Sequence, residues 1–535
     1  MSSVPLALIL FACGTTAGKG ADRSSVPPTA LGGDTETADT GEPQSVSVSA
    51  SIRPVGHDIR LAYWLDVSAD APVSVSATWS DGVVEGWVSS DEAALSHSLL
   101  LVGLRADRAV TVAVVVADEA DAELDPLSLD LYTDTLPEVF PLFDVVAHDP
   151  DRTEPGYLLF PLYSGAYAYL VALDEELEVV WFQEKRWTDV RIHRGNLFGI
   201  TDKDVVEMTF AGDEVRRYSQ DAYTGGPSTP MDLGGDVHHE VFPQPDDSFL
   251  VLSHVSHQVD LYPTSYYRPY DSLAGPQMVK SAIATEVAAD GSTVRAVDMI
   301  DVLDTERISW DGLDGAHNDW VHANALIPHP DGGMIVSLRH QDAVVKVDGD
   351  GALEWILADH AGWRGAYRDK LLVPISDPFI WPYHQHAPQW IEDGSEPFGR
   401  LLVFDNRNRG ATVYSEAPPG EQSAGVIEYL IDENNGAVSM VGRWEDFGST
   451  TPLVADAYGD ADLQPQTGNI LATFGRVQTE YGGSDDQASV ARLIEFHSSD
   501  PTDPALDLRL WGDPRMWRSD RCERIAPLRA PAPTE

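Results

Sequence analysis

Histidines that could take part in catalysis gather in one stretch of this chain. Eleven of its sixteen histidines lie between His238 and His386. They form three clusters with other polar residues, in the segments GDVHHE, NDWVHANAL…SLRHQD and YHQHAP…FDNRNRG. The members with chemical potential are His238 and His239 in the first cluster, His317, Asp319, His322, Asn324, Arg339 and His340 in the second, and His384, His386, Asp405, Asn406 and Arg409 in the third.

An arginine among histidines points to a site for an anion. Each histidine cluster comes just before a segment that we expect to open a strand, and Arg339 follows an apolar strand segment. A guanidinium with imidazoles suits an oxyanion such as sulfate or phosphate. A neutral imidazole could also be a nucleophile toward that anion. The same convergence leaves a metal site open, although an arginine is a poor neighbour for a cation.

Six similar segments of strand-forming sequence must position these clusters. Each combines an apolar strand, a polar turn and a second strand, and none shows an amphipathic helix. Strand-only repeats of about 40–75 residues are typical of β-propeller blades. We therefore predict a six-bladed β-propeller over residues 138–530. The six segments are residues 156–182, 195–218, 243–262, 328–357, 392–431 and 465–496.

A propeller would bring the three clusters together at equivalent positions, because the innermost strand of every blade starts at the same face of the central channel. We expect Arg339 at the end of an innermost strand, from which it could reach the same channel. Insertions near residues 257–284, 300–325 and 360–386 would build a binding face there. Aromatic residues near these insertions could line a pocket for an aryl group. They are Tyr262, Tyr266, Tyr267, Trp310, Trp381 and Tyr383.

The region before the propeller divides into three parts. Residues 45–137 hold short strands with period-two alternation, such as AVTVAVVVAD, and we predict a fibronectin-III/immunoglobulin-like β-sandwich there. Residues 14–44 are rich in Thr, Ser, Gly, Pro and Asp, a composition typical of a disordered tether. Residues 1–13 suit a signal peptide that ends in a lipobox-like LFAC, with Cys13 as the lipidated residue.

Charge and cysteine content exclude several classes of function. The chain has 35 Lys+Arg against 86 Asp+Glu, a formal net charge of −51. Nucleic-acid binding needs a basic surface, and binding to anionic lipid by charge is equally disfavoured. Only two cysteines are present among 535 residues, which excludes a disulfide scaffold and a Cys-rich zinc site. We expect an extracytoplasmic protein, periplasmic or on the cell surface, with contact to the membrane only through a lipid on Cys13.

The motifs of the three clusters resemble those of the bacterial aryl-sulfate sulfotransferase family. The matching segments are HHE, DWVHANAL…DGGMIVSLRHQDAVVKVD…EWIL, QHAP…LLVFDNRNRG, GNILATFG and the closing WRSDRCERIAPL. The resemblance implies an all-β fold, an N-terminal β-sandwich followed by a six-bladed β-propeller, with no cofactor. It also implies sulfuryl transfer from a phenolic sulfate ester to an acceptor phenol, through a sulfohistidine and without a nucleotide sulfate donor.

The resemblance also assigns roles to single residues. His386 matches the family's nucleophile, and His322, His239 and Arg339 match its other catalytic groups. His239 is favoured over its neighbour His238. Positive charge from Arg339 would stabilise the transferring sulfuryl group, and His322 or His239 would act as general acid and then as base. Substrate-binding roles are expected for His238, Asn324, Asn406 and Tyr383.

Two other functions stay open from the sequence. One is a non-catalytic propeller on the cell surface that binds a partner, and the other is a metal-dependent propeller hydrolase. Under the sulfotransferase hypothesis the partners are two small molecules, the phenolic sulfate donor and the phenol acceptor. A homo-oligomer is a further open alternative.

Overall fold

The computed structural model describes residues 46–118, 120, 122–221, 223–266, 274–313, 317–392, 398–415, 423–448, 452–477, 490–512 and 517–530. The predicted signal peptide, Cys13 and the predicted tether lie outside the described residues. Those that are described fall in one compact unit, Val46–Glu535. They are arranged almost entirely in β-strands, so the predicted all-β class is confirmed. No helix among them is long and apolar enough to span a membrane.

One long strand, β2, organises the N-terminal region. Its first half pairs with β1 and β4, and its second half with β3 and β5, of which β5 also pairs with β6. Inward residues of both halves, such as Leu65 and Val75, bury a common core with Leu101 and Val112. The strands are β1 (Val48–Gly56), β2 (Ile59–Ser80), β3 (Glu85–Ser89), β4 (Ala94–Leu101), β5 (Ala109–Asp118) and β6 (Leu127–Tyr132).

The first three sheets after this region are antiparallel blades with one innermost strand each. Blade 1 is β34 (Glu523–Ile525), β8 (Tyr157–Ser164), β9 (Tyr167–Leu173) and β10 (Val179–Gln183). Blade 2 is β11 (Asp189–His193), β12 (Asn196–Thr201), β13 (Asp204–Met208) and β14 (Glu214–Ser219), with β15 (Thr229–Pro230) at its edge. Blade 3 is β16 (Asp236–Pro243), β17 (Phe249–Pro263), β18 (Ala274–Val287) and β19 (Thr293–Asp298), with β20 (Asn318–Asp319) and helix α1 (Met299–Val302) beside it.

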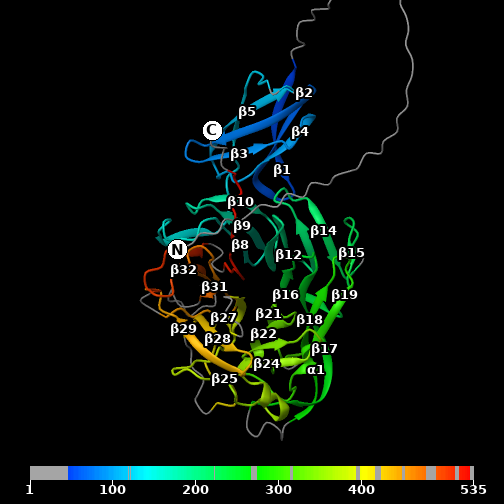
Figure 1. The fold of residues 1–535 in the computed structure, drawn as a ribbon, viewed down its shortest axis with the longest axis vertical. Coiled ribbons are helices and arrows are strands. Elements are labelled where there is room, and N and C mark those ends of the chain that lie inside the picture. Colours follow the sequence, from blue (N-terminus) through cyan, green and yellow to red (C-terminus); the bar gives the residue numbers. More distant parts are fainter. Residues whose placement is uncertain are drawn as a thin grey trace, which may run out of the picture. The chain divides into compact units, whose positions relative to one another are not determined.

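The other three blades follow in chain order, as the colours of Figure 1 show. Blade 4 is β21 (Ala323–Pro328), β22 (Met334–Leu338), β23 (Ala343–Val347) and β24 (Leu353–Ala358), with the 3₁₀ turns η2 (Arg339–Gln341) and η3 (Gly365–Lys370). Blade 5 is β26 (His386–Ile391), β27 (Phe398–Asp405), β28 (Gly425–Asp432) and β29 (Ala437–Trp444), with β25 (Val373–Pro374) at its edge. Blade 6 is β30 (Asp460–Leu463), β31 (Ile470–Val477), β32 (Val490–Phe496), β33 (Leu506–Trp511) and β7 (Leu142–His148).

Each pair of neighbouring blades shares a hydrophobic core, and this holds the ring together. The core between blades 4 and 5, for example, joins Val344 of β23 to Ile427 of β28. The middle strands are therefore covered on both faces, and strands such as β22 and β23 are buried along their whole length. By contrast β5 alternates buried and exposed residues, since only one of its faces covers a core.

Both ends of the propeller close the ring between blades 6 and 1. The last strand, β34, pairs with β8 as the innermost strand of blade 1. The first strand, β7, pairs with β33 as the outermost strand of blade 6. A shared core that includes Phe160 and Leu493 fills the space between the two blades. The predicted six-bladed propeller is thus confirmed.

The N-terminal strands continue the outer edge of blade 1. Strand β2 pairs with β10 at Arg60 and Phe182, and buried Arg105 forms an ion pair of 2.8 Å with Asp174 of the β9–β10 turn. The boundary predicted at residue 137 stays a prediction, since strands of the two regions share one sheet. The first predicted insertion is in fact a long hairpin, in which β17 pairs with β18 beyond the blade, for example at Val259 and Gln277.

Candidate active site

Irregular starts of three inner strands shape the site. Strands β16, β21 and β26 each carry a β-bulge near their beginning, between Val237 and Val241, between Ala323 and Ala325, and between His386 and Gln389. A bulge bends the strand and re-aims its side chains. Residues in the left-handed region accompany all three bulges: His239 (φ 55°), His322 (φ 42°) and Ala387 (φ 41°). Histidine adopts this region more readily than most non-glycine residues, which helps to place imidazoles here.

The three histidines occupy different register positions, contrary to our expectation of equivalent ones. His239 lies inside the bulge of β16, His322 directly precedes β21, and His386 is the first residue of β26. Arg339 was predicted at the end of an innermost strand, and this is wrong. It follows β22, the second strand of blade 4, and opens the turn η2. Bulges and turns, and not the repeat alone, bring these groups to one end of the channel.

His386 has a tautomer that its surroundings fix. Its Nδ1 lies 2.5 Å from Oδ1 of Asn406. The amide nitrogen of Asn406 donates to the carbonyl oxygens of Ala455 and Tyr458, so its Oδ1 must face the imidazole. An amide oxygen only accepts, and therefore Nδ1 of His386 carries the hydrogen and Nε2 keeps a lone pair. Both polar atoms of Asn406 are thus engaged within the protein, behind the imidazole.

His322 has a carboxylate partner of the kind found in hydrolytic triads. Its Nδ1 lies 2.6 Å from Oδ2 of Asp319, three residues earlier. The carboxylate accepts from Nδ1 and so leaves Nε2 of His322 as the basic nitrogen. Asp319 received no role from the sequence, although its spacing to His322 could have suggested one.

Arg339 is held by groups on several elements and keeps one donor free. Its Nη1 donates to Nε2 of His340 at 2.5 Å, and its Nη2 donates to the carbonyl of Asp456 at 3.3 Å. His340 in turn donates from Nδ1 to the carbonyl of Asp319 at 2.6 Å. Among the described residues, the buried Nε of Arg339 has no hydrogen-bond partner. That N–H is available for an anionic ligand.

Two hollows meet at His239. The larger, about 120 Å³, is lined by His238, His239, His254, Lys280, Ser281, Ala282, Asp319, His322 and Ala323. The smaller, about 30 Å³, is lined by Asp189, His239, Asn324, His386, Ala387, Tyr458, Gly459, Asp520 and Arg521. A group bound beside His239 would thus adjoin the residues of both hollows. Lys280 and His254, which border the larger hollow, had no role in the sequence-based prediction.

Four histidines of the site are neutral at physiological pH. Burial lowers the pKa of His239 to about 4, against the opposing effect of Asp319. Burial and the cation of Arg339 hold the pKa of His386 well below its ordinary value of 6.5. Burial is also the main cause that lowers the pKa of His322 and of His238. Neutral imidazoles can act as nucleophiles or bases without first losing a proton.

The other predicted substrate-binding residues have contacts of their own. His238 contacts His239 through Nδ1 at 2.8 Å, and among the described residues its buried Nε2 has no hydrogen-bond partner. Asn324 donates to the carbonyl of Gln385 and lines the smaller hollow. Tyr383 is buried, and its hydroxyl donates to Asp359 at 3.1 Å. Their contact with substrate stays a prediction.

The predicted aromatic lining is wrong for Tyr262. That residue is fully buried in the core of blades 3 and 4, and its hydroxyl donates to the carbonyl of Gly312. Trp310 donates to the carbonyl of Ala411. Tyr267 lies outside the described residues.

The residues present fit a metal ion poorly. Ligand atoms of Asp319, His322 and His340 lie within 4.8 Å of one another. However, both ring nitrogens of His340 are engaged, one by a backbone carbonyl and the other by the guanidinium of Arg339. A cation would also face that guanidinium. A second group, His329, Asp331 and Glu433, already holds the ammonium of Lys346 between its carboxylates.

Comparison with known proteins covers most of the propeller. The family profile described as Arylsulfotransferase (ASST) matches residues 144–506. The arylsulfate sulfotransferase AssT of Lelliottia amnigena is 31% identical over 170 residues, which are 28% of this chain and 27% of that protein. The arylsulfate sulfotransferase AssT of Escherichia coli O6:H1 is 32% identical over 184 residues, 30% of this chain and 29% of that protein. These alignments thus span under a third of either relative.

Among solved structures, a protein of unknown function from Bacteroides caccae aligns with a TM-score of 0.38 and 12% identity. The alignment covers 66% of this chain and 94% of that one. A streptogramin B lyase aligns with a TM-score of 0.30 and 9% identity, over 69% of this chain and 97% of its own.

Proposed function

Because the chain belongs to the arylsulfotransferase family, we propose that it moves a sulfuryl group from an aryl sulfate to an acceptor phenol through a sulfohistidine at His386. The observation that carries this proposal is the fixed tautomer of His386. Its Nδ1–H is held by Asn406, and its Nε2 keeps a lone pair in a buried site where the imidazole is neutral. A neutral imidazole with one defined basic nitrogen is a competent nucleophile.

In the first half-reaction, Nε2 of His386 attacks the sulfur of the donor. The N–S bond forms as the bond from sulfur to the aryl oxygen breaks, and the aryl group departs as a phenol or phenolate. Negative charge on the three non-bridging oxygens needs cationic donors that are already in place. The Arg339 guanidinium, with its buried Nε–H unpaired among the described residues, supports this role.

In the second half-reaction, Nε2 of His322 accepts the proton of the acceptor phenol. The acceptor oxygen then attacks sulfur, the N–S bond breaks, and its electron pair returns to His386. The carboxylate of Asp319, 2.6 Å from Nδ1 of His322, would stabilise the imidazolium that forms. That proton can go to the leaving phenolate of the next donor, since a bound anionic sulfate would favour protonated His322.

We further propose that the reaction needs no nucleotide sulfate donor and takes place outside the cytoplasm. The chemistry above requires only two phenolic partners, and both are compatible with an extracytoplasmic setting. Support for the location is the lipobox-like sequence that ends at Cys13, ahead of the Thr/Ser/Gly/Pro/Asp-rich stretch of residues 14–44.

Turnover of a chromogenic aryl sulfate by the dialysed protein tests the proposal. With 4-nitrophenyl sulfate we expect slow release of nitrophenol alone, and faster release on addition of a second phenol, with the sulfated acceptor seen by mass spectrometry. Quenching with donor alone should add the mass of one sulfuryl group to the peptide that contains His386. Absence of turnover with a range of aryl sulfates would favour the binding module, whereas turnover abolished by a chelator would favour a metal-dependent hydrolase.

A further inference from the structure

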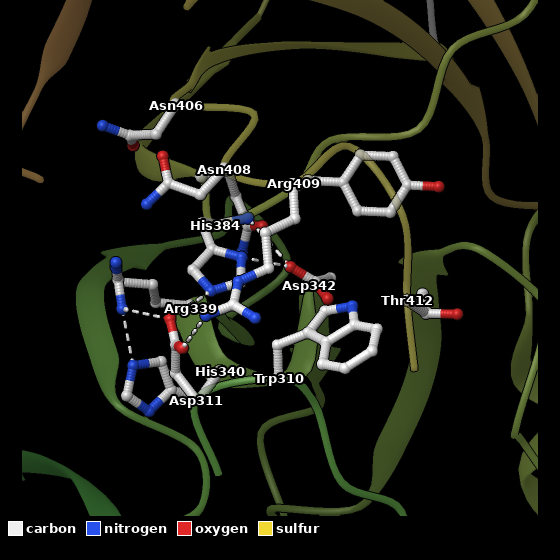
Figure 2. Close-up of polar contacts among 12 residues, drawn as sticks. Trp310, Asp311, Arg339, His340, Asp342, His384, Asn406, Asn408, Arg409 and Thr412 are labelled. Atoms are coloured by element: carbon white, nitrogen blue, oxygen red, sulfur yellow. Dashed lines mark hydrogen bonds and ion pairs between the residues drawn. The ribbon is translucent and has the colours of Figure 1, made fainter. Parts of the chain in front are cut away.

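The imidazole of His384 lies between two carboxylates, two residues before the proposed nucleophile. Its Nδ1 is 2.8 Å from Oδ1 of Asp342, and its Nε2 is 2.9 Å from Oδ2 of Asp311. The side chains of His384 and Asp342 are each only 1% exposed. Figure 2 shows His384 between the two carboxylates, with Arg339 beside Asp311. None of these contacts was evident from the sequence, because Asp311 lies 73 residues before His384.

Two facing carboxylates require two donors on the ring. An ionised carboxylate only accepts hydrogen bonds, while a neutral imidazole has a single N–H. If His384 were neutral, one carboxylate oxygen would face a ring lone pair at hydrogen-bonding distance. Buried Asp342 would also lose its cationic partner, at a large cost in free energy. The geometry therefore requires the imidazolium.

We propose that His384 is held as an imidazolium throughout the working pH range, and that this charge keeps His386 in its neutral, nucleophilic form. His384 is thus a positioning and electrostatic residue of the site, and this part of the inference rests on the proposed function. That charge faces the carboxylates of Asp311 and Asp342.

The electrostatic surroundings of His384 agree with this assignment. Burial alone would lower the pKa of His384, and Arg339 acts in the same direction. The carboxylates of Asp342 and Asp311 outweigh both, so that the pKa of His384 is raised above 6.5. The pKa of Asp311 is correspondingly lowered, chiefly by its hydrogen bond from His384. The ring of His340, whose centroid is 6.0 Å from that of His384, is neutral because burial lowers its pKa.

Asp311 also connects His384 to two arginines. Its Oδ2 lies 3.8 Å from Nη1 of Arg339, and its Oδ1 lies 3.2 Å from Nη2 of Arg409. The guanidinium of Arg409 in turn lies over the ring of Trp310. The insertion that carries Asp311 is therefore tied to blade 4 through Arg339 and to blade 5 through His384 and Arg409. An imidazolium at His384 fixes the carboxylate that helps to orient Arg339.

Charges that act on His386 come from several elements. Burial is the main cause of its lowered pKa, and the charges of Arg339 and His384 lower it further, whereas the bond to Asn406 opposes them. Asp189, Asp520 and Arg521 line the same hollow as His386. Among these groups His384 is the nearest along the chain, only two residues away. Removal of its charge should make His386 easier to protonate.

The pH dependence of His384→Gln tests the electrostatic role. Activity is lost in acid as His386 becomes protonated. In the variant we expect the midpoint of this acidic limb of kcat/KM to move up by about one pH unit, the order of magnitude for loss of one nearby unit charge. Activity above the limb should be retained within about tenfold. A merely structural role would lower activity at every pH without moving the midpoint, and that result would overturn the proposal.

A second measurement requires neither activity nor folding of the variant. In protein labelled with ¹⁵N-histidine, the His384 ring should show two protonated nitrogens from pH 6 to pH 8. A neutral ring at pH 7 would contradict the inference whatever the substrate proves to be. If instead aryl sulfates are not turned over but the ring is doubly protonated, the proposed function fails and the imidazolium stands.

Discussion

The amide of Asn406 and the imidazole of His386 form a pair in which each fixes the other's orientation. Oδ1 of Asn406 lies 2.5 Å from Nδ1 of His386, and the amide nitrogen is committed to two backbone carbonyls. A nucleophilic histidine needs a hydrogen-bond acceptor that fixes its tautomer. That acceptor must carry no charge, so that the ring stays neutral. An amide supplies this, whereas a carboxylate in the same place would favour the imidazolium.

Asn406→Asp should therefore raise the pKa of His386. We expect the acidic limb of kcat/KM to move up by at least about one pH unit, with activity partly recovered at higher pH, where the ring again becomes neutral. The measurement is a pH–rate profile with an aryl sulfate donor. Asn435→Asp, in an exposed turn, controls for the added charge. An unmoved limb in Asn406→Asp would mean that Asn406 does not set the state of His386.

His386→Ala should abolish transfer and leave the fold intact. Loss of the covalent route should lower kcat by at least about a thousandfold, several kcal/mol in the barrier. Circular dichroism and thermal unfolding report on the fold, and the mass increase on the peptide should disappear with the activity. Turnover within about tenfold of the unchanged protein would rule out the nucleophile.

Arg339→Lys should be far from conservative. Lysine cannot reproduce the planar fork that donates to His340 and to the carbonyl of Asp456 while it keeps Nε–H for the substrate. We expect kcat/KM to fall by about two orders of magnitude or more. Arg364→Lys is the matched control, since Arg364 makes a comparable fork to Asp304 on the surface. Equal turnover for both variants would make Arg339 structural.

Mild acid should destabilise the protein through its buried neutral histidines. The pKa of His239 falls from 6.5 to about 4 on folding because of burial. Well above pH 6.5 the His239 ring is neutral in both the folded and the unfolded state, so this group does not change the stability with pH. Below it the unfolded chain takes up a proton that the folded protein refuses, so stability falls until about pH 4. This one group accounts for a loss of roughly 3 kcal/mol in the free energy of unfolding over that pH range.

Denaturant unfolding of His239→Gln between pH 7 and pH 4 measures this effect. The free energy of unfolding of the variant should fall less on acidification than that of the unchanged protein. The slope of this free energy against pH should be smaller by the contribution of one proton. The substitution His497→Gln, at an exposed position, controls for the exchange of histidine for glutamine itself. His384 affects the stability in the opposite direction. Because folding raises its pKa, His384 stabilises the folded protein at low pH, and this contribution is lost as the pH rises through the raised pKa. An identical slope in His239→Gln would show that His239 is already charged in the folded protein.

A fifth prediction concerns Cys13. If this cysteine is lipidated, the protein should fractionate with membranes and enter a detergent phase, and Cys13→Ser should be soluble with unchanged specific activity. The strongly acidic chain would not stay on anionic lipid by charge alone. Recovery of the full chain in the cytosol with Met1 in place would contradict both the anchor and the location.

The propeller could be predicted because its evidence is local and repeated. Strand, turn and strand recur six times, and runs such as MIVSL and AVVKV are mostly apolar because neighbouring blades cover both faces. The same reasoning located the histidine clusters. It also placed Asp319 in the second cluster, but it did not pair this residue with His322, which lies three residues later and bonds to it.

What the sequence could not supply were the contacts between blades and insertions. The pairing of His384 with Asp311 joins residues 73 apart, through an insertion whose course no repeat dictates. The bulges in β16, β21 and β26 were equally hidden, because each depends on register against the next strand. For that reason Arg339 was assigned to the wrong strand, although its presence in the site was expected.

The closure of the ring by β34 has a consequence for synthesis of the chain on the ribosome. Among the strands that the structure describes, β34 is made last, yet it is the innermost strand of the first blade. Arg521, just before it, bonds to Glu240 of β16 in blade 3. While the chain emerges, blades 2 to 5 can form in order, but blade 1 lacks its inner edge and Glu240 lacks this cation. The nascent chain therefore cannot complete its channel before β34 has left the ribosome, so termination ahead of β34 yields an open array of blades without a closed site.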